Sequence, residues 1–136
     1  MTVSVPAGTT PGTYGVTATA SDPNHSATGT ANSTVTTPPE LIAVSTLTVS
    51  PGSVSVRSTV TIQATVTKAN GPVTGAAVTF TVTRSGTTTT KTATTNASGV
   101  ASWSYKAQQK GSYSVTVTAA SGGASASGGP VTFTAY

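Results

Sequence analysis

The 136-residue chain contains no cysteine. A disulfide framework, a catalytic thiol and a thiolate metal site are therefore excluded. The chain also has no apolar run as long as a transmembrane helix, so we expect no membrane insertion. Strand-like residues follow Met1 at once, and we therefore expect no signal peptide.

Charged residues are scarce, at 6% of the chain, and they are unevenly placed. Both acids, Asp22 and Glu40, lie in the first 40 residues, whereas all six basic residues follow them. A net charge of +4 is compatible with an anionic partner, but the bases are dispersed and do not cluster on one predicted strand or loop. We interpret the charge as solubilising and expect no nucleic-acid partner.

Residues 45–136 contain no Asp, Glu or His, which removes most catalytic groups. A glycosidase needs two carboxylates, and a serine triad needs a base, whereas the single histidine, His25, lies in a predicted turn. Asp22 with Asn24 forms either a fragment of a calcium site or a plain Asx turn. We therefore predict no enzyme activity, no metal centre and no cofactor.

Threonine and serine are abundant, at 50 positions, and they alternate with the apolar residues that make up 35% of the chain. An alternation with a period of two is typical of strands that bury one face. Threonine is β-branched and suits the exposed face of such strands. No stretch has the period of a helix, and Gly or Pro interrupts the chain at roughly ten-residue intervals. The sequence therefore predicts an all-β fold.

Two strands around a short polar connection are predicted within residues 99–119, and Trp103 and Tyr113 each lie on an apolar face. The threonine-rich run 87–95 has almost no apolar residue, which predicts an edge strand on which Lys91 guards against further pairing. A Gly/Ser loop is expected at 121–129, before a last strand at 131–135. Roughly seven strands with turn signals every 8 to 12 residues are the pattern of an immunoglobulin-like β-sandwich.

The chain also contains an internal repeat. GTYGVTATA, which begins at Gly12, matches GSYSVTVTA, which begins at Gly111, so the offset is 99 residues. Val3 and Val5 occupy places that correspond to Trp103 and Tyr105. A period near 100 residues is the usual size of a sandwich of this type.

This period predicts a domain organisation in three parts. Residues 1–37 are the last three strands of an incomplete immunoglobulin-like repeat. Residues 38–44 are a linker stiffened by two adjacent prolines. Residues 45–136 are a complete immunoglobulin-like domain, long enough to form its own core.

Three segments of residues 44–136 resemble the bacterial immunoglobulin-like domains of invasins, intimins and many secreted hydrolases. The resemblance is carried by Gly71, Pro72, Val73, Gly75, Val78 and Phe80, then by Thr95, Gly99 and Ala101, and then by Gly111, Tyr113, Val115 and Ala119. It implies a tandem array outside a bacterial cell that serves as a spacer, a stalk or a substrate-contact module.

The aromatic residues Trp103, Tyr105 and Tyr136 are the candidate ligand contacts, because carbohydrate-binding modules stack sugars on exposed aromatic rings. The period of two places Trp103 and Tyr105 on the face of Ala101, which the family pattern turns inward. We therefore favour packing over binding for the first two. The predicted core anchors are Val60, Ile62, Phe80, Trp103, Tyr113, Val115 and Phe133.

These observations predict a non-catalytic structural or spacer module of a secreted or cell-surface bacterial protein, flanked by immunoglobulin-like domains of the same chain. One alternative is a module that binds polysaccharide or fibrous protein through its outer face. A second alternative is self-association through residues 1–37, because three strands with an apolar face cannot close a sandwich alone.

Overall fold

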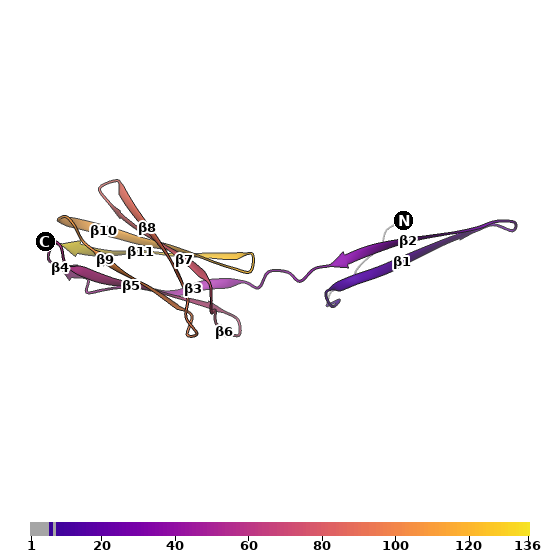
Figure 1. The fold of residues 1–136 in the computed structure, drawn as a ribbon, viewed down its shortest axis with the longest axis horizontal. Helices are drawn as coiled ribbons and strands as arrows, with labels where there is room; N and C mark the ends of the chain where they lie inside the picture. Colours follow the sequence, from indigo (N-terminus) through magenta and orange to yellow (C-terminus); the bar gives the residue numbers. More distant parts are fainter. Residues whose placement is uncertain (1–5, 7) are drawn as a thin grey trace. The chain divides into compact units, whose positions relative to one another are not determined.

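The structure, a computed structural model, describes residue 6 and residues 8–136 (Figure 1). The chain divides into two compact units, Met1–Pro38 and Pro39–Tyr136. Strands account for 68% of the residues, so the prediction of an all-β fold is confirmed. The strand predicted at residues 1–5, with Val3 and Val5, lies outside the described residues.

The first unit holds a long hairpin of β1 (Gly12–Ser21) and β2 (Ser26–Val35). The two strands pair antiparallel from Gly12 opposite Val35 to Ser21 opposite Ser26. In the turn between them, the Asp22 Oδ1 atom accepts hydrogen bonds from the backbone N–H groups of Asn24 and His25, each at 2.8 Å. This is the geometry of an Asx turn, one of the two interpretations that the sequence offers for Asp22 and Asn24.

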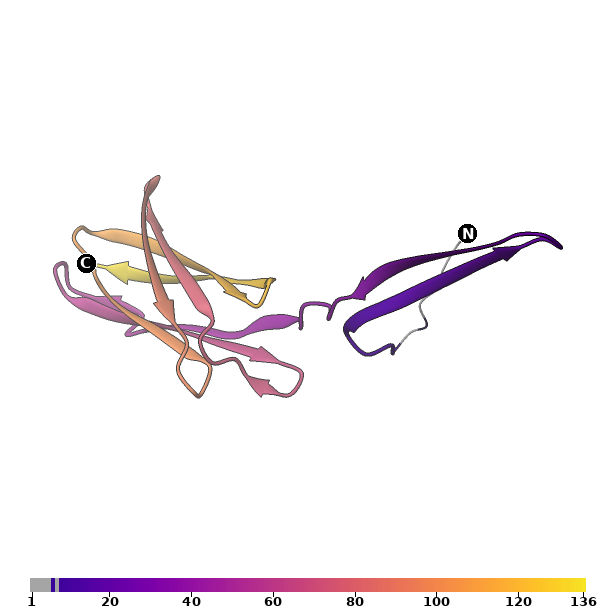
Figure 2. The same ribbon diagram turned by 45° about the vertical axis from the view of Figure 1, so that its right-hand side comes forward.

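The second unit is a sandwich of two sheets (Figures 1 and 2). In the first sheet, β5 (Thr59–Lys68) pairs with the strands β3 (Ile42–Ser50), β6 (Gly71–Pro72) and β9 (Val100–Lys106). The second sheet has the order β4 (Ser53–Val54), β11 (Ala124–Ala135), β10 (Gly111–Ser121), β7 (Ala77–Arg84) and β8 (Thr87–Thr94). This arrangement confirms the predicted immunoglobulin-like sandwich.

The alternating pattern explains the core between the two sheets. Along β5, Val60, Ile62, Ala64 and Val66 are fully buried, and threonines and a glutamine stand between them. Strands β7 and β10 supply the opposite side of the core in the same way. Burying a side chain the size of Val or Phe contributes about 1.5–3 kcal/mol, and these three strands supply most of the buried apolar side chains.

The strand β3 begins at Ile42, within the segment predicted as the linker 38–44, so that prediction is wrong at its C-terminal end. Ile42 pairs with Lys68 of β5, and its side chain packs against the core. Glu40 adds an ion pair, with its Oε2 atom 2.8 Å from Lys68 Nζ. Ladder hydrogen bonds and apolar burial therefore extend the strand toward the prolines.

The Gly/Ser loop predicted at 121–129 is also wrong, because β10 continues to Ser121 and β11 starts at Ala124. The reason is tertiary. A Cβ atom on Gly128 would lie 2.7 Å from Val44 Cγ1, so glycine lets β3 pack directly on β11. This glycine marks a close approach between strands rather than a loop.

The hydroxyl of one buried threonine connects two loops by hydrogen bonds. Thr95 is the buried polar side chain among the described residues. Its Oγ1 atom accepts a hydrogen bond from Ala76 N at 2.9 Å and donates one to Val73 O at 2.5 Å. Next to it, Gly99 has a φ of +74°, and its carbonyl accepts a hydrogen bond of 2.8 Å from Val66 N. The residues of the predicted family patterns therefore serve the fold.

Candidate functional site

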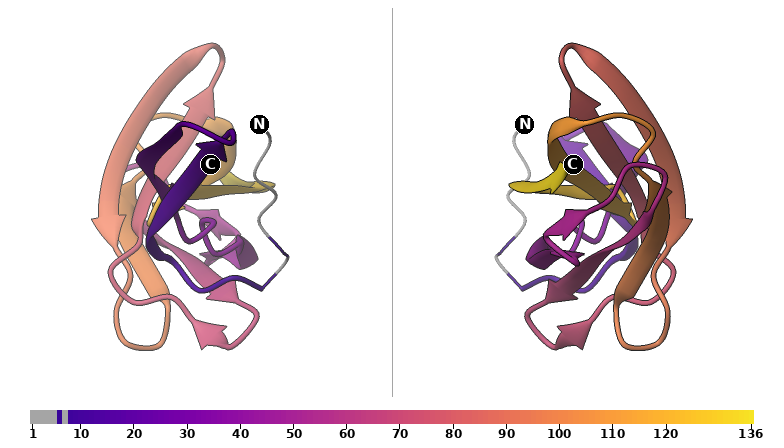
Figure 3. Two further views of the ribbon diagram at one scale, coloured as in Figure 1. Left: turned by 90° about the vertical axis from the view of Figure 1, so that its right-hand side faces the viewer. Right: turned by 90° about the vertical axis from the view of Figure 1, so that its left-hand side faces the viewer.

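The open side of the sandwich lies between two edge strands, β8 of the second sheet and β9 of the first. Among the residues that the structure describes, β8 pairs only with β7, and β9 pairs only with β5. The β7–β8 hairpin projects beyond the other strands of its sheet (Figures 1 and 3). The sandwich therefore has an uncovered margin on this side.

The inner face of β8 is unusual because it is polar. In the pairing of β7 with β8, Phe80 stands opposite Lys91 and Val82 stands opposite Thr89. Residues directly opposite each other share a face, so Lys91 and Thr89 lie on the same side as the core residues of β7. They are nevertheless exposed, since β8 is the last strand of its sheet. An inward-pointing charge also protects an edge strand from further pairing.

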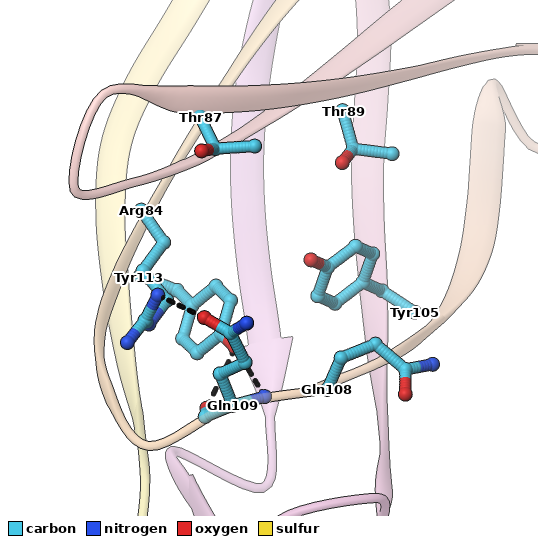
Figure 4. A pocket seen from close by; sticks show the side chains of 7 residues that line it. All are labelled: Arg84, Thr87, Thr89, Tyr105, Gln108, Gln109 and Tyr113. Carbon is cyan, nitrogen blue, oxygen red and sulfur yellow. Dashed lines mark hydrogen bonds between the residues drawn. The ribbon is translucent and has the colours of Figure 1, made fainter.

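A groove of about 210 Å³ lies at this margin, and we call it the edge groove. In Figure 4, Thr87 and Thr89 on β8 face Tyr105 and the two glutamines across an open space. The full lining consists of Arg84, Thr87, Thr89, Tyr105, Gln108, Gln109 and Tyr113.

Arg84 is the charged group of the edge groove. Its Nε atom donates a hydrogen bond to Lys110 O at 2.8 Å, and its Nη1 atom donates one to Gln109 Oε1 at 2.6 Å. The guanidinium carbon lies 5.9 Å from the centroid of the Tyr113 ring. Gly111 permits this position, because a Cβ atom there would lie 3.2 Å from Arg84 Nε. The arginine is therefore held in place from two sides.

Tyr113 forms the floor of the edge groove. Its hydroxyl donates a hydrogen bond to Gln109 O at 2.7 Å and accepts one from Gln109 N at 3.1 Å. This is the tyrosine corner known from immunoglobulin-like folds. The ring stacks on Phe133 with a centroid distance of 4.7 Å and an angle of 6°. The loop that carries Gln109 is thereby tied to the core.

Tyr105 stands at the wall of the edge groove. Its ring makes edge contacts with Trp103 at 5.0 Å and with Phe133 at 6.1 Å. Burial raises the pKa of Tyr105 above its ordinary value, and the neighbouring Tyr113 adds to the rise, while Thr89 and Arg84 oppose it. Its hydroxyl therefore keeps its proton at neutral pH and remains a hydrogen-bond donor.

The three candidate ligand contacts predicted from the sequence lie in two different environments. Trp103 and Tyr105 lie on the inner face with Ala101, and both are half-buried because β9 is an edge strand. Tyr136 is 66% exposed and does not line the edge groove. The predicted core anchors Val60, Ile62, Phe80, Tyr113, Val115 and Phe133 are at most 3% exposed, whereas Trp103 packs against the core from its margin.

Arg84 and the two glutamines were not among the residues predicted from the sequence. One signal was present, because the alternation of β7 places Arg84 on the face of Val78, Phe80 and Val82. An arginine on a core face, in a stretch without any carboxylate, indicates an unusual environment. Nothing in the sequence singled out Gln108 and Gln109. They lie in the loop after β9, and the tyrosine corner holds that loop beside the groove.

The hairpin of the first unit repeats the tyrosine corner. The hydroxyl of Tyr14 donates a hydrogen bond to Thr10 O at 2.6 Å, four residues back, as Tyr113 does in the second unit. Val16 and Ala18 then stand where Val115 and Val117 stand in β10. In the second unit these positions are at most 2% exposed, whereas in the first unit they are partly exposed. The same strand pair thus buries its apolar face in one unit and leaves it open within the other.

Neither a metal centre nor a membrane helix is found in the described part of the chain. Residues 6 and 8–136 contain no group of three or more His, Cys, Asp or Glu side chains placed to hold a metal ion. The same residues contain no helix long and apolar enough to cross a membrane.

Comparison with known families agrees with this architecture. Residues 44–134 match the family described as Bacterial Ig-like domain (group 1). The chain belongs to this family. Bacterial Ig-like domains of this group are non-enzymatic and are typical of bacterial surface or extracellular proteins. The predicted resemblance is therefore confirmed. A search among curated proteins finds no match.

The patterns that this bacterial Ig-like domain shares with its family supply only a small part of the edge groove. Among the pattern residues, Tyr113 lines the groove and Gly111 makes room for Arg84. The rest pack in the core or shape turns, as Thr95 and Gly99 do. The family patterns thus explain the fold, and the groove depends on residues outside them.

Proposed function

We propose that this chain is a non-catalytic spacer module of a bacterial extracellular or surface protein, which holds neighbouring domains apart and bears load along its strands. One observation carries the proposal. Within the unit Pro39–Tyr136, β3 begins at one end of the sandwich, and the chain leaves β11 at the other end (Figures 1 and 2). Modules joined through such ends follow one another lengthwise.

The hydrogen bonds near the two ends suit this role. Strand β3 pairs with β5 from Ile42 opposite Lys68 to Ser50 opposite Thr61. At the far end, β4 runs parallel to β11, and Tyr136 N donates to Val54 O at 3.0 Å. A pull on both ends acts along these strands, so several hydrogen bonds share the load rather than breaking one after another.

The chemistry of the second unit supports a role without catalysis. Residues 45–136 have no carboxylate side chain and no imidazole, the groups that most often serve in general acid–base catalysis. The one nearby acid, Glu40, is paired with Lys68 at 2.8 Å.

We test the lengthwise path with a distance measurement between spin labels. The chain has no cysteine of its own, so Leu41→Cys and Tyr136→Cys, at positions 86% and 66% exposed, give two unique attachment sites. The nine residues of β3 alone span about 30 Å. We expect one narrow distribution centred at or above this distance. A mean below about 15 Å would place both ends on the same side of the sandwich and contradict the proposal.

The β1–β2 hairpin supports a second module of the same kind, because it reproduces the tyrosine corner and the apolar positions of β10. We propose that residues 1–37 are the closing strands of such a module. If its apolar face instead recruits another copy of the chain, Val16→Ser will lower the mass measured by light scattering at high concentration. A monomer mass at all concentrations would exclude self-association through residues 1–37.

A further inference from the structure

We propose that the edge groove binds an acidic polysaccharide through the carboxylate of a uronate residue. The proposal goes beyond the spacer role, since it gives the module a ligand of its own. It rests on the charge and hydrogen-bonding groups that converge between β8 and the loop after β9 (Figure 4).

The first argument is the unused capacity of Arg84. A guanidinium group has five N–H donors, and the two hydrogen bonds to Lys110 O and Gln109 Oε1 use two of them. Residues 45–136 offer no carboxylate side chain, and Glu40 is engaged by Lys68. Arg84 is therefore a positioned cation with free donors and no counter-charge. A carboxylate is the anion that a planar guanidinium group recognises best among common biological groups other than phosphate.

The second argument is the neutral lining that surrounds this cation. Thr87 and Thr89 contribute hydroxyl groups, Gln108 contributes an amide, and Tyr105 contributes a hydroxyl that keeps its proton. These groups both donate and accept hydrogen bonds, as the hydroxyl groups of a sugar do. The half-buried Tyr105 ring adds an aromatic surface beside them. A phosphate ion alone would leave most of this lining unused.

The third argument is size and continuity. The volume of about 210 Å³ is below the range of drug-sized pockets and suits a single sugar ring. Thr87 stands directly opposite Arg84 in the pairing of β7 with β8, and Lys91 lies four residues beyond Thr87 on the same face of β8. The two cations, Arg84 and Lys91, are therefore offset by about 13 Å along the strands. Two cations at this spacing match repeated acidic groups on a polymer rather than one isolated anion.

An acidic peptide is the competing ligand, since it also carries repeated carboxylates. A peptide that pairs with β8 would lie along its outer edge, where the strand has unpaired backbone groups. The edge groove lies on the inner face of β8, away from this outer edge, and the side chains of Thr87 and Thr89 face into it (Figure 4). The placement therefore favours the saccharide.

We test the proposal by titrating the ¹⁵N-labelled chain with tetragalacturonate, neutral cellotetraose and tetraglutamate in low salt. Tetragalacturonate is expected to shift the backbone amide signals of Tyr105, Gln109 and Lys110 to saturation. Cellotetraose should leave them unmoved, and tetraglutamate should bind at least tenfold more weakly. Raising the ionic strength to about 0.5 M should weaken tetragalacturonate binding, because Lys91 is exposed and Arg84 is only half-buried. Absence of shifts, or equal affinity for tetraglutamate, overturns the proposal.

Variants separate the groove from general charge attraction. Arg84→Lys keeps the charge but removes the planar donor group, so we expect at least a tenfold loss of affinity. Tyr105→Phe removes only a hydroxyl and should cost about twofold to tenfold. The matched control is Lys106→Gln, which removes one charge from the outer face of β9 and should change affinity less than twofold.

A further variant guards against misfolding. Arg84 supports the loop at Gln109 and Lys110, so Arg84→Lys can lose affinity through a disturbed loop. Lys91→Gln changes an exposed side chain and leaves that loop intact, and it should weaken tetragalacturonate at least threefold. If Tyr105→Phe and Lys91→Gln both bind like the unmodified chain, the groove is not the site and the proposal is wrong. The spacer role would survive that result.

Discussion

Gly99→Ala is expected to lower the free energy of unfolding of the Pro39–Tyr136 unit by about 3 kcal/mol. The backbone φ of +74° costs an L-residue roughly 1–2 kcal/mol. The new Cβ atom would also lie 2.5 Å from Val66 O and 2.9 Å from Pro72 Cβ. The turn cannot move away freely, because Gly99 O accepts the hydrogen bond from Val66 N. Crowding of this kind adds about 1–3 kcal/mol.

The matched control for this variant is Gly75→Ala. Gly75 has nearly the same φ, +76°, but a Cβ atom there would meet nothing within 4 Å. It should therefore lose only the conformational part, about 1–2 kcal/mol. Urea denaturation followed by the fluorescence of Trp103, the single tryptophan, reports on this unit alone. Equal losses for the two variants would show that the contact with Val66 O does not constrain the turn.

Phe133→Ala is expected to cost about 3–5 kcal/mol, the range for a fully buried aromatic residue. Phe133 is 1% exposed and stacks on Tyr113, with ring centroids 4.7 Å apart. It also makes the edge contact with Tyr105 at 6.1 Å. Truncation leaves a cavity under the tyrosine corner, and neighbouring rings held on separate strands cannot collapse fully into it.

The neighbouring aromatic residue provides the control for Phe133→Ala. Tyr136 is 66% exposed, and its contacts with β4 are made by its backbone. Tyr136→Ala should change the free energy of unfolding by less than about 0.5 kcal/mol. Urea denaturation of both variants tests the pair. A loss below 1 kcal/mol for Phe133→Ala, or a similar loss for both, would contradict the assigned core.

The sandwich could be predicted from the sequence because its longest strands alternate apolar and polar residues. In β5 the residues Val60, Ile62, Ala64 and Val66 alternate with polar residues, and this period alone identifies the buried face. The threonine-rich β8 was predicted as an edge strand for the opposite reason, since it has almost nothing to bury. The local pattern of a strand was sufficient to predict its buried face wherever the residues of that strand alone determine which side is buried.

The predictions failed where burial depends on two strands at once. Residues 124–128 are rich in Gly, Ala and Ser, and they form a strand because Gly128 accepts Val44 of β3 at close range. Trp103 was assigned to the correct face, but its half-burial follows from the position of β9 at the sheet edge. The alternation predicts the side of a strand on which a residue lies. It does not predict which other strand packs against that side.

The edge groove was beyond sequence reasoning for a related reason. Arg84, Tyr105 and Gln108 come from two strands and a loop, and the tyrosine corner at Tyr113 holds that loop at Gln109. None of them forms a contiguous motif. The family patterns describe the core and the turns, so they identify the module without identifying its surface.

The most direct test of the spacer role is force spectroscopy on the whole chain, pulled from its two ends. Unfolding of residues 42–136 should appear as one cooperative rupture that releases about 300 Å of contour length. Val56→Pro removes the N–H that donates to Tyr136 O at 3.0 Å, and it should lower the rupture force, whereas Val56→Ala retains that donor and more of the force. Gradual extension without a rupture, or equal rupture forces for Val56→Pro and the unmodified chain, would contradict a module that resists a pull along its strands.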